Sequence, residues 1–273
     1  MTQARVHVRE LAGWGLDEYQ FRHAPIDDAR LSQAALAAAE RPSFQPESAL
    51  LPQETELLLD ALAPHTTRAD LLAEMSGLSW SLGVVDLRPL LAFQRRLSIR
   101  PDVPTLPVPI RKDWPALVNF SFGPQKRTEC EIIRDPASRT LVFRSENPNL
   151  QFGIRGEAAF PLNVHTGSPF FEIARFRDRW FLRDGYHRAY ALLKAGVFEM
   201  PAVIVQAGTI EELGATQPWF FPEEILFSGT PPRVVDFLND DLVLEYDRPA
   251  LIKTLRITME ESLTLATSSG EQL

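Results

Sequence analysis

Helical and strand-like spacings of apolar residues alternate along the chain. Apolar side chains recur every three or four residues in 54–63 and 68–75, which predicts two amphipathic helices. In 130–145, two apolar segments flank Asp135-Pro136-Ala137-Ser138, and this arrangement is typical of a β-hairpin. Because both kinds of element are mixed along the sequence, we expect an α+β fold.

The clearest pattern surrounds a strand-to-helix turn in the second half of the chain. Two short segments rich in aromatic residues, 170–176 and 179–183, predict a hairpin of strands. Apolar residues in 187–195 then follow helical spacing, and Gly196 stands where a left-handed residue usually ends a helix. The apolar run 200–205 predicts a buried strand. The expected order is therefore hairpin, turn, helix and strand.

The turn itself carries the candidate chemistry. The first turn of a helix has N–H groups without partners inside the helix, and the helix dipole adds partial positive charge there. Gly185 would let the backbone approach a ligand, and His187 and Arg188 add side-chain donors beside those amides. The residues therefore fit a phosphate site. A strand-to-helix turn with a purely structural cap is the alternative that they leave open.

The stretch "DGYHRAYALLKAGVFEMPAVIV" resembles the signature of the ParB/sulfiredoxin superfamily. In that family a Gly-x-His-Arg or Gly-x-Arg-Arg turn opens a helix that ends in glycine, and a strand beginning Ile-Pro or Val-Pro follows. The preceding "GSPFFEIARFRDRWFLRDG" is similar to the family's hairpin. The resemblance implies a ParB/sulfiredoxin-like core with a mixed sheet and a motif helix at about residues 151–206.

The resemblance also implies a ligand. Family members hold nucleotide phosphates at this turn: ATP in sulfiredoxin and in one group of free-serine kinases, and CTP in ParB proteins. By this resemblance Gly185, Tyr186, His187 and Arg188 would bind ATP, ADP or CTP, with a largely water-ligated Mg²⁺. Tyr186 occupies the position of sulfiredoxin's catalytic cysteine, so the reductive chemistry of sulfiredoxin is not implied.

Phosphoryl transfer requires a carboxylate or another base near the phosphates, and two acids are candidates. Strand alternation places Glu172 on the same face as Phe170 and Ala174, which allows a buried, partnered carboxylate. A solvated edge residue is the alternative. Asp184 directly precedes Gly185, where an aspartate either faces the site or caps backbone amides. We take Glu172 and Asp184 as the candidate catalytic residues.

The sequence predicts four regions in chain order. They are an N-terminal helical region packing on the core (1–100), a β-hairpin elaboration (101–150), the nucleotide-binding core (151–206) and an acidic C-terminal extension (207–273). The net charge is −8. Acids and bases balance at 24 each up to Gln206, whereas the extension holds 12 acids and 4 bases.

The mildly basic motif region suits a small polyanion better than a long nucleic-acid track. A helix-turn-helix around Gly77 is disfavoured because its second segment is apolar and lacks basic residues. The five histidines lack the spacings of structural zinc or metalloprotease sites, so no protein-bound metal is expected. With one cysteine and no apolar run of membrane-spanning length, we expect a cytoplasmic protein without a membrane partner.

Two functions follow from these features. One is a nucleotide-binding enzyme of the ParB/sulfiredoxin type, an ATP- or ADP-dependent kinase-like phosphotransferase or a nucleotide hydrolase, acting on a small molecule. The alternative is a nucleotide-gated regulatory or DNA-associated ParB-like binding protein without small-molecule catalysis.

Overall fold

The computed structural model describes residues 5–23, 25–52, 55–100, 107–124, 129–146, 150–154 and 162–261. The helices are α1 (Asp28–Ala39), α2 (Glu56–Leu62), η1 (Ala63–His65), α3 (Ala69–Glu74), α4 (Trp114–Ser121), α5 (Tyr186–Lys194), α6 (Ile210–Leu213), α7 (Glu223–Leu226) and η2 (Val234–Leu238), where η marks a 3-10 helix. The strands are β1 (Arg5–Leu11), β2 (Leu50–Leu51), β3 (Trp80–Asp86), β4 (Leu91–Ala92), β5 (Arg96–Ile99), β6 (Glu131–Asp135), β7 (Thr140–Ser145), β8 (Leu150–Ile154), β9 (Leu162–Thr166), β10 (Glu172–Phe176), β11 (Arg179–Asp184), β12 (Glu199–Ala207), β13 (Val243–Pro249) and β14 (Lys253–Thr258).

Two compact units form the chain, and each is discontinuous in sequence. Unit 1 comprises residues 1–126 and 168–250, and unit 2 comprises 127–167 and 251–273. The four regions expected from the sequence followed chain order, whereas the structure joins distant segments. The acidic C-terminal region is divided between the two units, because β13 belongs to unit 1 and β14 to unit 2.

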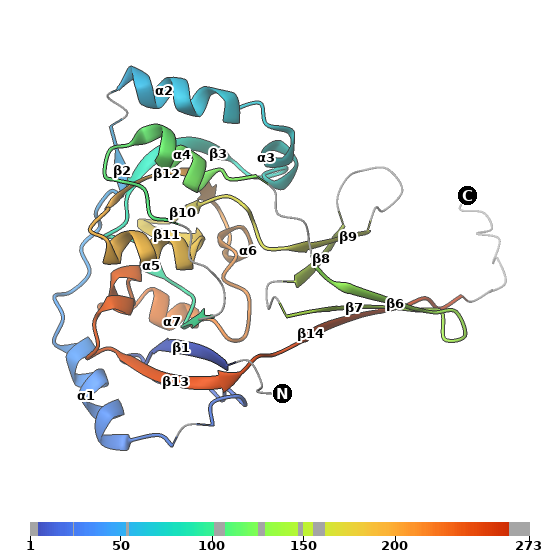
Figure 1. Ribbon diagram of the computed structural model, residues 1–273. Helices are drawn as coiled ribbons and strands as arrows, with labels where there is room; N and C mark the ends of the chain where they lie inside the picture. Colours follow the sequence, from blue (N-terminus) through green and yellow to red (C-terminus); the bar gives the residue numbers. More distant parts are fainter. Residues whose placement is uncertain are drawn as a thin grey trace, which may run out of the picture. The chain divides into compact units, whose positions relative to one another are not determined.

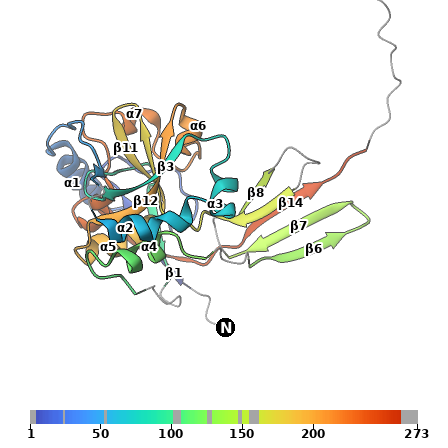
Figure 2. The ribbon, with the colours of Figure 1, turned by 90° about the horizontal axis from the view of Figure 1, so that it is seen from above.

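A six-stranded mixed sheet in the order β2-β3-β12-β10-β11-β4 organises unit 1 (Figure 1). Strand β10 pairs antiparallel with β11 and parallel with β12, so α5 is the connection that returns the chain to the same sheet. The predicted hairpin, helix and strand are all present, and the α+β class is confirmed. Figure 2 shows α4 and α5 on one side and α6 and α7 on the other, with β11 and β12 between them.

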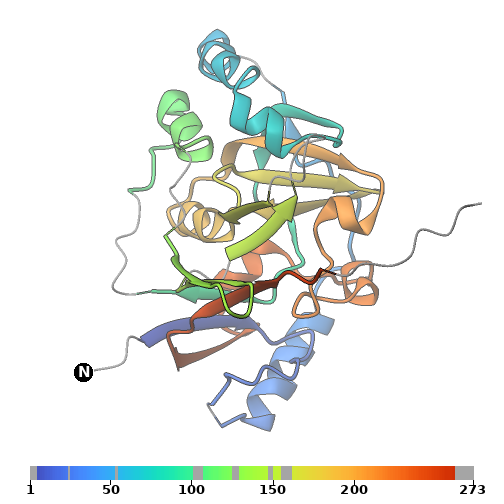
Figure 3. The same cartoon turned by 90° about the vertical axis from the view of Figure 1, so that its right-hand side faces the viewer.

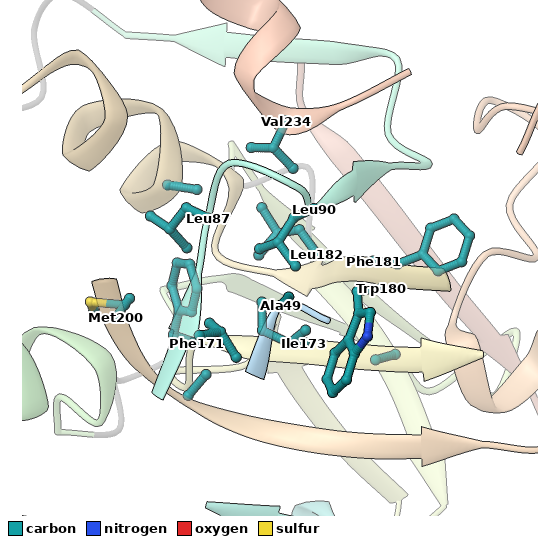
Figure 4. Close-up of a cluster of buried hydrophobic side chains, with 14 of the residues drawn as sticks. Ala49, Leu87, Leu90, Phe171, Ile173, Trp180, Phe181, Leu182, Met200 and Val234 are labelled. Carbon is teal, nitrogen blue, oxygen red and sulfur yellow. The ribbon is translucent and has the colours of Figure 1, made fainter. Parts of the chain in front are cut away.

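The core of unit 1 explains why β10 and β11 are apolar on both faces. Successive residues of both strands are buried, which is the pattern of strands covered on two sides. Each fully buried large side chain contributes about 1.5–3 kcal/mol to the free energy of unfolding. Figure 4 shows part of this core, including Phe171, Ile173, Trp180, Phe181, Leu182, Leu87 and Leu90.

A second sheet of unit 1, in the order β13-β1-β5, brings the two ends of the unit together. Strand β1 pairs antiparallel with β13 over Arg5–Leu11 and Pro249–Val243 (Figure 3). Helix α5 packs against η2 and β5, so the motif helix lies between the two sheets of unit 1. The segment after β12 is therefore an integral part of the unit that holds the motif.

Unit 2 contains the predicted hairpin of β6 and β7. Strand β14 pairs antiparallel with β7, giving a three-stranded sheet in the order β14-β7-β6, and β8 pairs with β9. Part of the proline-rich stretch before α4, residues 101–106, lies outside the described residues.

The segment considered as a helix-turn-helix does not form one. Helix α3 is followed by β3, an inner strand of the six-stranded sheet that pairs with both β2 and β12. Val84 and Val85 of β3 are buried. The apolar character of this segment therefore serves the core, as the absence of basic residues indicated.

Two glycines set the limits of α5. Gly185 precedes the helix with a φ of +100°, and Gly196 follows it with a φ of +73°. A side chain at Gly185 would also collide with the core, because its Cβ would lie 2.6 Å from Cδ2 of Phe171, a fully buried ring. No heavy atom lies within 4 Å of a Cβ placed at Gly196.

We predict that Gly185→Ala destabilises the chain more than Gly196→Ala. Both variants would carry the cost of a left-handed residue, about 1–2 kcal/mol. Gly185→Ala must also displace the ring of Phe171, and overpacking of this kind typically costs a further 1–3 kcal/mol or so. Urea unfolding of the two variants measures the difference. Equal losses would show that the backbone conformation alone explains the glycine.

Candidate functional site

A β-bulge at the end of β11 assembles the candidate site. Glu172 is paired with Asp184, but the next residue, Ile173, is paired with Leu182, so Arg183 has no partner on β10. In a regular strand Arg183 and Asp184 would point to opposite faces. The extra residue breaks that alternation, and bulges commonly redirect side chains in this way. Arg183 and Asp184 therefore both lie near Glu172.

Glu172 is the more deeply buried of the two candidate carboxylates, with 2% of its surface exposed. Its Oε2 accepts a hydrogen bond from Nη1 of Arg183, and the two side chains form an ion pair. Its Oε1 is buried and has no hydrogen-bond partner among the residues that the structure describes. The prediction of a buried, partnered carboxylate is thus correct for one oxygen, while the other oxygen has an unmet acceptor.

Asp184 lies opposite Glu172 at the end of β11. Its Oδ2 accepts a hydrogen bond of 3.3 Å from the main-chain N–H of Ser168. The side chain keeps some contact with solvent, yet protein surrounds most of it. This burial, together with the nearby charge of Glu172, raises the pKa of Asp184 to about 7, although Arg188 and the amides of Ser168 and Gly185 act in the opposite direction.

Arg188 holds three parts of unit 1 together. Its Nη1 donates to the carbonyls of Phe120, Ser121 and Pro169 at 2.9–3.2 Å, and its Nη2 donates to the carbonyl of Phe170. We call this set the Arg188 clamp. It joins the first turn of α5 to the end of α4 and to the segment that enters β10. The N–H groups that the sequence assigned to a phosphate are thus directed at carbonyls in this structure.

The other predicted nucleotide contacts have separate surroundings. Tyr186 is buried, and its hydroxyl accepts hydrogen bonds from the amides of Phe93 and Gln94 at 3.0 and 3.3 Å. Its ring packs against Phe93 and Phe237. Gly185 is buried, and a Cβ placed on it would meet the core ring of Phe171.

His187 differs because it stays exposed at the first turn of α5. Its Nε2 lies 2.9 Å from the carbonyl of Ser98, and because a carbonyl only accepts, Nε2 carries the hydrogen. Surrounding protein lowers the pKa of His187, which favours the neutral ring. Nδ1 is then the acceptor of the imidazole.

The structure brings Glu172 and Asp184 together, with Arg183 as a third member that the sequence prediction missed. The available signal was a charged residue ending the apolar run of β11, but the bulge that redirects it depends on pairing with β10. Tyr186 and the Arg188 clamp face protein, while His187 faces solvent. Among the residues described, no group of three or more His, Cys, Asp or Glu side chains could hold a metal ion.

Two surface hollows lie at other places. One of about 250 Å³ is lined by Arg30, Asp240 and Glu245 together with Val243 and Leu244. Another, of about 340 Å³, is in unit 2 and is lined by residues of β6, β7 and the segment before β14. Within the described part of the chain, no helix is both long and apolar enough to cross a membrane.

Comparison with known proteins gives no match: no family model, no curated protein and no solved structure corresponds to this chain. The function has to be inferred from the residues of the site.

We predict that Arg188→Ala destabilises unit 1 by about 3 kcal/mol or more, because it leaves four carbonyls without their charged donor. Arg188→Lys should recover only part of this, since one ammonium cannot reproduce the fork of a guanidinium. Chemical denaturation measures both. Arg175→Ala, which removes an exposed arginine of β10, is the control and should change stability by less than about 0.5 kcal/mol. If Arg188→Ala had the same free energy of unfolding as the unmodified chain, the clamp would contribute nothing to stability.

We predict that the raised pKa of Asp184 makes the chain lose stability as the pH rises. The folded state holds this proton up to about pH 7, whereas an unfolded aspartate releases it near about pH 3.9. The contribution is therefore complete below pH 4 and is lost as the pH rises through 7. Asp184→Asn lacks this titration, so its stability relative to the unmodified chain should increase between pH 4 and pH 7. Urea unfolding at several pH values measures the difference, and a constant difference would contradict the assignment.

Proposed function

We propose that the chain binds the phosphate groups of a nucleotide at the first turn of α5 and transfers a phosphoryl group with the help of Glu172 and Asp184. The hairpin, helix and strand of unit 1 would then be a ParB/sulfiredoxin-like core, as the sequence resemblance implies. The observation that carries the proposal is the buried Oε1 of Glu172, which receives no hydrogen bond from the described part of the chain. A buried acceptor without a partner is costly, so a ligand that supplies the donor explains why it is tolerated.

The phosphate contacts that we propose differ from those expected at first. The amides of the first turn would meet the phosphate oxygens, and His187 would join them by taking up a proton at Nδ1 when the phosphate binds, since its Nε2–H already donates to Ser98. Arg188 would contribute its positive charge from behind the turn, while its N–H groups stay on the carbonyls of the clamp. Mg²⁺ would be held mainly by the phosphate oxygens and water. ATP, ADP and CTP are the nucleotides that the resemblance implies.

The proposed chemistry uses Glu172 as the proton acceptor. The hydroxyl of a small acceptor donates to Oε1, gives up its proton to Glu172, and its oxygen forms a bond to the terminal phosphorus. The bond between that phosphorus and the bridging oxygen of the nucleotide breaks, and the shortened nucleotide leaves. Water in place of the acceptor would make the same site a hydrolase.

We predict that one of ATP, ADP, CTP or GTP, with Mg²⁺, raises the melting temperature of the chain. At a concentration of 100 times Kd, binding adds about 2.7 kcal/mol of stability. Glu172→Gln should keep this shift and lower nucleotide consumption by about 10²–10⁴-fold, since a base is lost while the binding groups remain. Glu223→Gln, at an exposed carboxylate of α7, is the matched control and should leave both readouts unchanged.

The outcomes separate the two functions that the sequence left open. A thermal shift without nucleotide consumption would favour the nucleotide-gated binding protein. No shift with any of the four nucleotides would contradict the phosphate site itself.

A further inference from the structure

Glu172 and Asp184 are paired across β10 and β11, and none of the described hydrogen bonds joins their carboxyl groups. The residues are directly opposite on neighbouring antiparallel strands, where the Cβ atoms of a pair lie about 4.5–5.5 Å apart. Oε1 of Glu172 is buried, and no described residue is its hydrogen-bond partner. If both groups were ionised, two like charges would share a site with little water, and such pairs retain one proton.

The charged groups around the pair are not equivalent for the two carboxyls. Arg183 donates from Nη1 to Glu172, and its Nε donates to the carbonyl of Glu212 at 3.2 Å, which ties the guanidinium to α6. Arg188 is near both carboxyls but directs its hydrogen bonds to the carbonyls of the clamp. The carboxyl group of Asp184 accepts a hydrogen bond from the main-chain N–H of Ser168. Glu172 therefore has an ion pair, whereas the described donors to Asp184 are the neutral main-chain amides of Ser168 and Gly185.

We propose that Glu172 and Asp184 share one proton, and that Arg183 is the positioning residue that places this proton on Asp184 by pairing with Glu172. The burial and the neighbouring Glu172 charge that raise the pKa of Asp184 act in the same sense. The role of Arg183 in positioning a proton acceptor rests on the proposed function, but the proton distribution is a property of the ligand-free chain.

Carboxyl ¹³C NMR of the full chain, labelled at Asp Cγ and Glu Cδ and free of ligand, tests this directly. One aspartate should titrate near neutral pH, and this signal should be missing in Asp184→Asn. Glu172→Gln removes the like charge and should lower the midpoint of Asp184. In Arg183→Met the ion pair that distinguishes the two carboxyls is lost, so the near-neutral midpoint should no longer belong to Asp184 alone. Arg183→Lys retains the charge and should leave the proton on Asp184.

An Asp184 midpoint near the ordinary value of about 4, or one unaffected by Glu172→Gln, would overturn the shared proton. A midpoint that stays on Asp184 in Arg183→Met would overturn the role of Arg183. If Arg183→Met does not fold, the Glu172→Gln titration and the Arg183→Lys titration still decide.

The same titrations distinguish this proposal from the proposed function. Failure of every nucleotide to bind would leave the titrations valid and remove only the phosphate site. Nucleotide consumption whose pH profile is the same in Arg183→Lys, Arg183→Met and the unmodified chain would remove Arg183 from the reaction while leaving the phosphate site in place.

Discussion

The Arg188 clamp is the interaction on which the site depends. Its guanidinium joins the first turn of α5 to the end of α4, where the carbonyl of Ser121 also accepts the N–H of Phe171 and the Ser121 hydroxyl donates to the carbonyl of Pro201. The start of β10, the start of β12 and the start of α5 are thereby fixed to one another. Gly185 also lies against Phe171 at this point, so the motif is in the first place a structural junction.

The acidic pair is the feature that this junction does not explain. The clamp needs no carboxylate, yet the bulge at Arg183 directs two carboxyls and one guanidinium toward each other beside it. Burying such groups is costly unless all of their hydrogen bonds are made, and Oε1 of Glu172 accepts none from the described residues. A stable core would be simpler without them, which is why we assign function to Glu172 and Asp184 rather than to the whole turn.

Local patterns in the sequence were sufficient for the elements around the motif. The aromatic segments before residue 184, the helical spacing after it and Gly196 depend on neighbours in the chain, so the hairpin, α5 and β12 were predicted correctly. Arg183 was missed because its direction depends on a register shift across two strands. Likewise, the partners of Tyr186 and Arg188 are main-chain groups of Phe93, Phe120 and other distant residues, and no side-chain pattern marks them.

The pairing of β1 with β13 has a consequence for synthesis of the chain on a ribosome. Strand β1 is made more than two hundred residues before its partner β13. At about 5–20 residues per second, the nascent strand waits for its partner on the order of tens of seconds. Unit 2 has a delay about half as long, since β7 ends at Ser145 and its partner β14 begins at Lys253. During that interval the open edge of β1 is the segment that a nascent-chain chaperone would have to shield from pairing with other chains.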